Sequence, residues 1–455
     1  MCSDGKYIPM GEAARELKVT KARISQLITA GKLTGMLVGG RRMIAVDSLA
    51  RYKQAGGSRS TRKRAERYTL MSADYTIARV EFDAQREAPL TVQEVLDEAR
   101  MPFGTVGSTG SVRLRALNDW WLHRSVPNTR PGMLAKLEDL GLSSTHSLPM
   151  RNLGLSLSDC YWLQPEGRDD LSWADINYFD NDFEGSGLHG RDEWLGAVGL
   201  DSPDNTSEGE LPKRWAIRNG QRVLIKGCAT DDQRPFNEVV ASALHRRLLQ
   251  PGAYVPYELV KVQGEPACVC PDFLASREEY IPAAYVKESL GATRGLSTYD
   301  RLVRYMGRWL CDEEAVRESL SRMIVCDALV ANTDRHWRNF GFIRSVDTLE
   351  VRPAPLFDSG NSLWYAKSAA EVERGDWTFA SRPFDFNPER QLALADRLDW
   401  FDEAALKGFV DEAIELLSQS ASATQDGRLD YVAQGLRARV GAVAAAVRTL
   451  KNVVR

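Results

Sequence analysis

Two carboxylates and one carboxamide lie at spacings that suit phosphoryl transfer. Asp334 and Asn339 stand five residues apart in the run N-T-D-R-H-W-R-N-F-G, and Asp358 follows Asn339 by 19 residues in L-F-D-S-G. In such a site one carboxylate orients the attacking hydroxyl, while the carboxamide and the second carboxylate hold Mg²⁺ against the nucleotide phosphates. The spacing therefore predicts Asp334 as the catalytic carboxylate, Asn339 and Asp358 as Mg²⁺ ligands, and ATP as the phosphoryl donor.

A kinase also needs a lysine on a central strand for the phosphates and a glutamate on the next helix to fix that lysine. Lys226 ends the apolar run R-V-L-I-K, and Glu238 is expected in the first turn of the helix F-N-E-V-V-A-S-A-L-H-R-R-L. Taken singly, Lys226 is as well explained as a surface lysine, and Glu238 as an acid that favours a helix N-terminus. Their order ahead of Asp334 favours the catalytic interpretation.

The loop that should cover the phosphates lacks the usual glycine pattern. Residues 202–213 read S-P-D-N-T-S-E-G-E-L-P-K, with Gly209 as the single glycine, and no G-x-G-x-x-G run precedes the lysine strand. The sequence also has no Walker A run, which disfavours a P-loop NTPase.

The sequence pattern predicts the strands and helices that carry the candidate site residues. Asn219-Gly220 between two β-like runs predicts a hairpin whose second strand carries Lys226. Two further strands are expected around Gly264, and helical periodicity dominates from about residue 298 to the end. The aromatic residues between 68 and 200, including Trp120 and Trp121, are expected in the core.

Bulk properties narrow the class of protein. A chain of 455 residues has room for about three domains. No apolar stretch approaches the length of a membrane helix, and the N-terminus lacks a signal-peptide core, so we expect a cytoplasmic protein without membrane contact. The seven cysteines do not lie at zinc-ligand spacing and are expected as reduced thiols.

The first 67 residues are strongly basic, with 15 Lys and Arg against 5 Asp and Glu in a chain of net charge −3. A basic head on an acidic body predicts an anionic partner, and nucleic acid is the first candidate. Residues 54–67 are rich in Gly and Ser and then basic, which predicts a flexible linker.

Within residues 1–55, two short predicted helices precede a hairpin at Gly39-Gly40 and a third helix. Thr20 is expected to cap the second helix. This order resembles the excisionase and MerR-type winged helix–turn–helix DNA-binding modules. A protein-binding winged helix with merely solvated charges is the alternative. The resemblance implies a DNA-contacting set on the second helix and the wing, made of Lys21, Arg23, Ser25, Gln26, Arg41 and Arg42.

A second resemblance covers roughly residues 200–400. The set T-S-E-G-E-L-P-K, V-L-I-K, F-N-E-V-V, N-T-D-R-H-W-R-N-F-G and F-D-S-G resembles the HipA-like serine/threonine kinases, which include the CtkA-like proteins. It implies the roles predicted above for Lys226, Glu238, Asp334, Asn339 and Asp358. HipA toxins act with a separate DNA-binding antitoxin, whereas here a different DNA-binding module is fused to the kinase. Asp358 is also followed by Ser-Gly rather than Phe-Gly.

The same resemblance implies further site residues. His336 would brace the catalytic loop. Thr206 and Ser207 stand where some family members phosphorylate themselves and thereby shut the loop. The nucleotide would also meet the phosphate loop at Gly209 and Lys213, and the hinge at Pro271, Asp272 and Phe273.

Together these features predict an α+β, bilobal protein-kinase-like fold with a small N-terminal domain. The expected parts are a winged helix–turn–helix at 1–55, a basic linker at 56–67, a mixed region at 68–200 that packs on the kinase N-lobe, that N-lobe at 201–273, and a helical C-lobe at 274–455. The first function is an ATP- and Mg²⁺-dependent kinase of toxin or regulatory type, acting on a protein, on itself or on tRNA. The alternative is a DNA-binding transcriptional regulator whose kinase fold only senses nucleotide. A homodimer would suit paired DNA half-sites.

Overall fold

The chain divides into two compact units, Met1–Glu66 and Arg67–Arg455. The predicted division into five parts is finer than this and stays a prediction. The structure, a computed structural model, describes residues 7–17, 19–29, 32–38, 41–54, 65–83, 86, 88–107, 109–124, 149–183, 203, 213–227, 232–262, 264–291, 294–309 and 312–454.

The first unit is a small mixed α/β fold around one apolar core. A three-stranded antiparallel sheet has the order β1-β3-β2, and the helices bury Ala13, Leu17, Ile24 and Leu27. Thr20 accepts a hydrogen bond from the backbone N–H of Arg23, as a helix cap should. Strand β1 was not foreseen, and the assignment to a DNA-binding module stays a prediction. The elements are β1 Tyr7–Pro9, α1 Met10–Glu16, α2 Lys21–Thr29, β2 Gly35–Val38, β3 Arg41–Ala45 and α3 Val46–Gln54.

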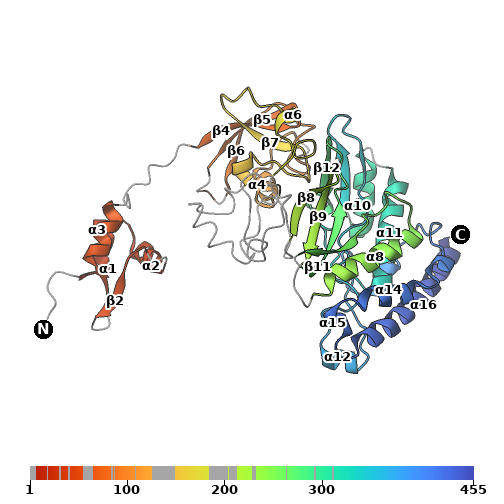
Figure 1. The fold of residues 1–455 in the computed structure, drawn as a ribbon. Helices are drawn as coiled ribbons and strands as arrows, with labels where there is room; N and C mark the ends of the chain where they lie inside the picture. The colour runs from red at the N-terminus through yellow and green to blue at the C-terminus, as the bar shows by residue number, and fades with distance from the viewer. Residues whose placement is uncertain are drawn as a thin grey trace. The chain divides into compact units, whose positions relative to one another are not determined.

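The second unit begins with a four-stranded sheet of order β6-β5-β4-β7 (Figure 1). Helix α4 packs on it and buries Trp120 and Trp121, as expected of these aromatic residues. The elements are β4 Glu66–Ser72, β5 Tyr75–Phe82, β6 Leu90–Val95, α4 Leu114–Leu122, η2 Pro149–Asn152, β7 Tyr161–Pro165 and α6 Trp173–Ile176.

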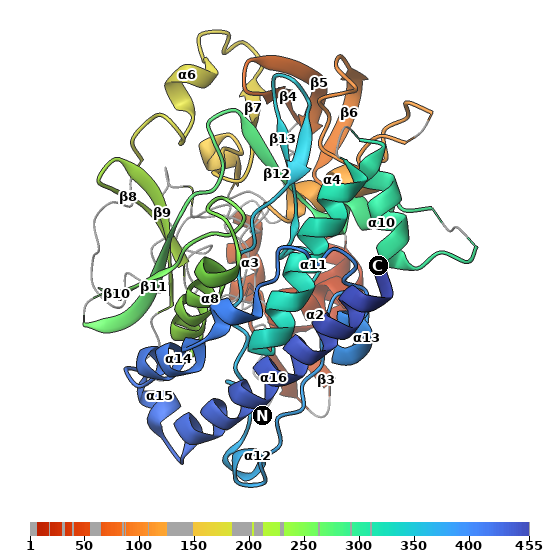
Figure 2. The same ribbon diagram turned by 90° about the vertical axis from the view of Figure 1, so that its right-hand side faces the viewer.

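A second four-stranded sheet, of order β10-β11-β9-β8, carries the lysine strand. Asn219 and Gly220 both have positive φ, 51° and 76°, as a two-residue hairpin turn of this kind requires. Helix α8 packs against β9, β10 and β11 (Figure 2). It begins two residues before the predicted start, so Glu238 lies in its second turn rather than its first. The elements are β8 Lys213–Arg218, β9 Gln221–Gly227, α8 Arg234–Leu248, β10 Glu258–Val262 and β11 Glu265–Pro271.

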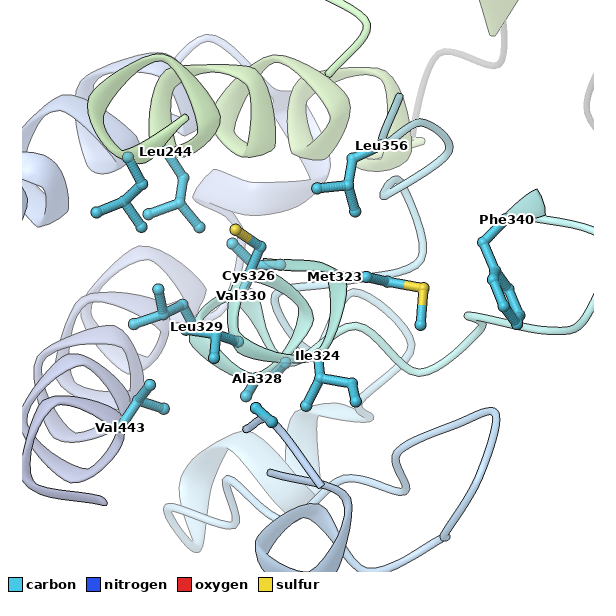
Figure 3. Packing of buried hydrophobic residues seen from close by; sticks show 14 of the residues in the cluster. Leu244, Met323, Ile324, Cys326, Ala328, Leu329, Val330, Phe340, Leu356 and Val443 are labelled. Carbon is cyan, nitrogen blue, oxygen red and sulfur yellow. The ribbon is translucent and has the colours of Figure 1, made fainter. Parts of the chain in front are cut away.

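The rest of the unit is mainly helical, as the periodicity from about residue 298 predicts, but it also contains a third sheet of order β12-β13-β14. Helix α11 runs through the largest apolar core and packs between Leu244 of α8 and Val443 of α16 (Figure 3). The elements are β12 Glu278–Pro282, α9 Ala283–Ser289, α10 Thr298–Gly307, α11 Glu313–Val330, β13 Gly341–Ser345, β14 Val351–Pro353, α12 Ala369–Glu373, α13 Pro388–Leu392, η4 Glu403–Leu406, α14 Phe409–Leu417, α15 Ala421–Thr424 and α16 Arg428–Val454.

Residues 67–183 pack on more than the predicted N-lobe. Their core includes Trp162 and Phe179 and is shared with Ile343 and Val346 of the third sheet, while Trp215 of β8 joins only at its edge. These residues therefore contact the β12-β13-β14 sheet as well as Trp215 and Ile217 of β8, and the predicted packing of residues 68–200 on the N-lobe stays a prediction. None of the helices in the described ranges combines the length and apolar content that a bilayer crossing requires.

Candidate active site

Lys226 joins the two carboxylates that the sequence placed beside it. Its ammonium lies on β9 with only 8 % of the side chain exposed, and Nζ is 3.3 Å from Glu238 Oε1 and 2.8 Å from Asp358 Oδ1. A third partner, the hydroxyl of the buried Tyr257, lies 3.0 Å from Nζ. Sequence reasoning gave Tyr257 no role, because a tyrosine ahead of a strand carries no distinctive signal.

Electrostatic interactions keep Lys226 and Asp358 charged. Burial alone would lower the pKa of Lys226, but Asp358, Tyr257 and Glu238 outweigh it and place the pKa well above the usual range. Burial raises the pKa of Asp358, yet Lys226 and Lys213 hold that pKa well below its ordinary value. For Glu238, burial raises the pKa and the ammonium only partly offsets it. At neutral pH the site therefore presents an ammonium beside an ionised Asp358.

The predicted catalytic loop folds back on itself around Asp334. The backbone N–H of Asp334 donates to Asn332 Oδ1 at 3.0 Å, and Asn339 Nδ2 donates to the backbone carbonyl of Asp334 at 3.3 Å. Asn361, three residues after Asp358, donates from Nδ2 to Asp334 Oδ2 at 2.7 Å. These contacts orient the Asp334 carboxylate and link the two segments that the sequence predicted to cooperate.

Arg335 is the residue that sequence reasoning missed most plainly. It stands inside the quoted T-D-R-H run, and its side chain is wholly buried. The guanidinium pairs with Asp327 of α11, with Nε 2.8 Å from Oδ2. It also donates to the carbonyls of Asn339 and Phe357 and to Ser359 Oγ. A single cation therefore ties the Asp334 loop to the Asp358 segment.

His336 makes contacts only within the loop among the described interactions. Its Nδ1 accepts from the backbone N–H of Arg338 at 3.2 Å, and its own N–H donates to the Asp334 carbonyl at 2.7 Å. These contacts suit the bracing role that was expected.

The predicted hinge stands at the end of β11. Pro271 pairs with Val223, and the N–H of Asp272 donates to the Arg222 carbonyl at 2.8 Å. The backbone N–H of Asp272 is therefore engaged with the neighbouring strand, and the expectation that Pro271, Asp272 and Phe273 meet the nucleotide stays a prediction. The Asp272 carboxylate accepts from the Leu274 N–H, and burial raises the pKa of Asp272 to about 7.

An aromatic pair lies beside the hinge. The Phe273 ring is stacked on Phe357, with centroids 5.4 Å apart, and Tyr280 packs edge-on against both rings. Phe357 immediately precedes Asp358. The packing of these rings therefore connects the hinge to the segment that carries Asp358.

Only some of the remaining predicted site residues fall within the residues that the structure describes. Lys213 opens β8 and lies directly across the sheet from Lys226. Gly209, Thr206 and Ser207 lie outside the described residues. In the first unit, Lys21 and Arg23 are exposed on α2 and Ser25 is half-buried, with its hydroxyl 3.6 Å from the Met10 sulfur. The side chains of Gln26, Arg41 and Arg42 lie outside the described set.

The oxygen atoms of the site suit a Mg²⁺ ion that is shared with a bound nucleotide better than a metal ion held by protein ligands alone. Within the described ranges, no group of three or more His, Cys, Asp or Glu could hold an ion, and four of the cysteines, Cys160, Cys268, Cys270 and Cys326, are free and buried. Mg²⁺ is commonly held by one or two protein oxygens together with phosphates and water. An ionised Asp358 and the amide oxygen of Asn339 fit that pattern.

Comparisons with known proteins found a family match over part of the chain and similarity to solved structures. Residues 215–424 match the HipA-like C-terminal domain family. Comparison with curated proteins found no match. The chain is similar to HipA of Shewanella oneidensis MR-1, from a complex with HipB and operator DNA, at 15 % identity and a TM-score of 0.50 over 85 % of this chain and 99 % of that chain. It is also similar to the Helicobacter pylori proinflammatory kinase CtkA, at 14 % identity and a TM-score of 0.42 over 53 % of this chain and 95 % of that one.

Proposed function

From a chain whose residues 215–424 form a HipA-like C-terminal domain, we propose an ATP- and Mg²⁺-dependent serine/threonine kinase. The observation that carries the proposal is the contact of Lys226 Nζ with both Glu238 and Asp358. In protein kinases the phosphate-binding lysine is paired with a helix glutamate, and the metal-binding aspartate completes the site.

Each residue then has a role that follows from its surroundings. Lys226 and Lys213 bind the phosphates, Glu238 fixes Lys226, and Asp334 orients the acceptor hydroxyl and holds its proton. Asn339 and Asp358 would hold Mg²⁺, which together with ATP supplies charge neutralisation and the transferable phosphoryl group. Tyr257, Arg335 and Asn361 position these groups through the hydrogen bonds described above.

Replacing Asp334 by Ala tests this proposal. With Mg²⁺ and γ-labelled ATP, the wild-type protein should label itself or an added protein, while Asp334→Ala should lose transfer and retain ATP binding. Asp169→Ala, an exposed aspartate away from the site, serves as the matched control and should behave as wild type. Equal labelling by wild type and Asp334→Ala would reject Asp334 as the catalytic carboxylate.

The acceptor is proposed to be a Ser or Thr hydroxyl on a protein or on this chain itself, with a tRNA hydroxyl as a further candidate. Thr206 and Ser207 are the proposed self-modified residues. Mass spectrometry of the labelled wild type, with Asp334→Ala beside it, would detect them, and phosphate on neither residue would remove this part of the proposal. A toxin role predicts that expression slows growth only with Asp334 intact.

We also propose that the first unit binds DNA. Lys21 and Arg23 are exposed on α2, the helix that follows the Thr20 cap, which suits contact with phosphates or base edges. Replacing both by Ala should weaken binding to DNA and reduce its salt dependence, since each phosphate contact releases counterions. Arg51→Ala on α3 is the control. The alternative function is a DNA-binding regulator whose kinase fold only senses nucleotide. It is favoured if every cellular effect persists in Asp334→Ala but is lost when Lys21 and Arg23 are replaced.

A further inference from the structure

Helix α8 presents more than Glu238 to the segment that carries Asp358. Three polar side chains at its N-terminal end are almost wholly buried: the preceding N-cap residue Gln233, and Asn237 and Glu238, have 3 %, 0 % and 3 % of their surface exposed. Buried polar groups need partners, because an unmade hydrogen bond in the interior costs free energy. The partners of these three side chains show what the helix holds.

The side-chain amide of Asn237 donates two hydrogen bonds to the backbone just after Asp358. Its Nδ2 donates to the carbonyls of Gly360 and Ser362, each at 2.8 Å. Its Oδ1 accepts from Gln233 Nε2 at 3.0 Å, which fixes the orientation of the amide. The neighbouring Glu238 uses Oε2 to accept from the Ser359 N–H at 2.8 Å.

The opposite side of the same segment is held by the catalytic loop. Arg335 donates to the Phe357 carbonyl and to Ser359 Oγ, and the N–H of Thr333 donates to the Asn361 carbonyl at 2.9 Å. The carbonyls of 357 and 361 thus face the loop, while those of 360 and 362 face α8. The segment is clamped between the helix that carries Glu238 and the loop that carries Asp334.

This segment needs such support because its backbone is strained. Asp358, Leu363 and Trp364 have φ values of 59°, 55° and 53°, in the left-handed region that non-glycine residues avoid. Each such residue costs on the order of 1–2 kcal/mol, and the conformation persists only where the surroundings over-determine it. Gly360 is pressed against α8, since a Cβ there would lie 3.3 Å from the Arg234 carbonyl.

We propose that Asn237 is a positioning residue that sets Asp358 relative to Lys226 and Glu238, so that α8 and the metal-binding segment act as one body. The inference rests on the proposed function, because it assigns Asn237 a part in Mg²⁺-assisted nucleotide binding. Asn237 itself is directed at backbone carbonyls and not at the nucleotide.

The test replaces Asn237 by Asp in the full chain, which keeps the size and turns a donor into an acceptor that faces two carbonyls. The matched control is Asn118→Asp: Asn118 is 3 % exposed and donates in the same way to the Leu90 and Leu114 carbonyls, in the first sheet of the unit. Binding of a fluorescent ATP analogue is measured with and without Mg²⁺, well below the unfolding temperature of each variant.

We expect metal-free affinity to change by less than about twofold in both variants. In Asn237→Asp the gain in affinity on adding Mg²⁺ should fall by about tenfold, equivalent to ~1.4 kcal/mol, while Asn118→Asp should keep the wild-type gain. A merely structural role would lower the unfolding temperature of both variants and leave the Mg²⁺ gain untouched, which would overturn the inference. Wild-type protein that binds no nucleotide under either condition would instead overturn the proposed function.

Discussion

At the scale of single residues, Lys226 joins the buried carboxylate of Glu238 to the half-buried carboxylate of Asp358. Removing the ammonium would leave the buried Glu238 carboxylate without its ion-pair partner, and breaking a buried ion pair in this way costs roughly 3–5 kcal/mol. We predict that Lys226→Met lowers the free energy of unfolding by that order and abolishes nucleotide binding. Urea denaturation and ATP-analogue titration measure the two effects.

Adding Glu238→Gln to Lys226→Met should recover part of the lost stability, because one of the stranded charges is removed. Losses that simply add in the double variant would mean that the two side chains are not coupled.

His245 on α8 gives the clearest expected pH dependence. Burial, together with the charge of Arg335, lowers the pKa of His245 to about 3, whereas an unfolded histidine titrates near ~6.5. Between these values the unfolded chain binds a proton that the folded chain does not. The free energy of unfolding should therefore fall as the pH falls, by up to ~1.4 kcal/mol per pH unit from this residue.

Replacing His245 by Gln should flatten the pH dependence of stability between about pH 6.5 and pH 3. Denaturant titrations of both proteins across that range measure the difference. The exposed His123→Gln serves as the control and should retain the wild-type slope. An unchanged slope in His245→Gln would show that the buried ring is not the source.

At the scale of elements, Gly341 connects the loop that carries Asp334 to the third sheet. It closes the N-F-G run and pairs with Pro282 across β12 and β13, and a Cβ there would lie 2.1 Å from the Ile281 carbonyl. We predict that Gly341→Ala forces the strands apart and costs at least about 1–3 kcal/mol of stability, as overpacking does. Thermal unfolding followed by circular dichroism measures the loss.

The control is Gly441 in the middle of α16, where an added Cβ meets nothing within 4 Å. Alanine there should leave stability unchanged or raise it by up to ~1 kcal/mol, because glycine is a poor helix former. If both alanine variants unfold alike, the close approach at Gly341 is not what constrains that position.

At the scale of the whole molecule, residues 67–183 belong to the same compact unit as the candidate active site. Arg344 of β13 is buried and paired with Glu279, and it donates to the Met101 carbonyl at 3.1 Å and to the Tyr161 hydroxyl at 2.9 Å. Trp162 and Phe179 share a core with Ile343 and Val346. Removing residues 67–183 would expose that core and leave Arg344 and Glu279 with too few partners.

We therefore predict that a chain of residues 67–455 unfolds in one cooperative transition, whereas residues 201–455 alone aggregate or lack a sharp transition. Calorimetry and size-exclusion chromatography distinguish these outcomes. A monomeric 201–455 fragment with a sharp transition would show that the shared core is dispensable.

Much of the site could be read from the sequence because its parts are local. The Asp334-to-Asn339 spacing, the Asn219-Gly220 turn and the order of Lys226 and Glu238 depend on neighbours within one or two elements. Local preferences and side-chain chemistry decide such features, so they appear in the sequence as recognisable patterns. The proximity of Lys226 to Glu238 and Asp358 was an inference from their order, and the structure places Lys226 Nζ 3.3 Å and 2.8 Å from the two carboxylates.

Tertiary structure alone decided which side chains hold these groups in place. Arg335, Tyr257, Asn237 and Asn361 contact segments far along the chain, and no spacing marks an arginine or asparagine as buried among carbonyls. The packing of residues 67–183 on the third sheet could not be predicted either. An apolar residue type indicates that a side chain is buried, but it does not indicate which element the side chain packs against. Partner choice in a core depends on the closing of the whole chain, and that is settled only in three dimensions.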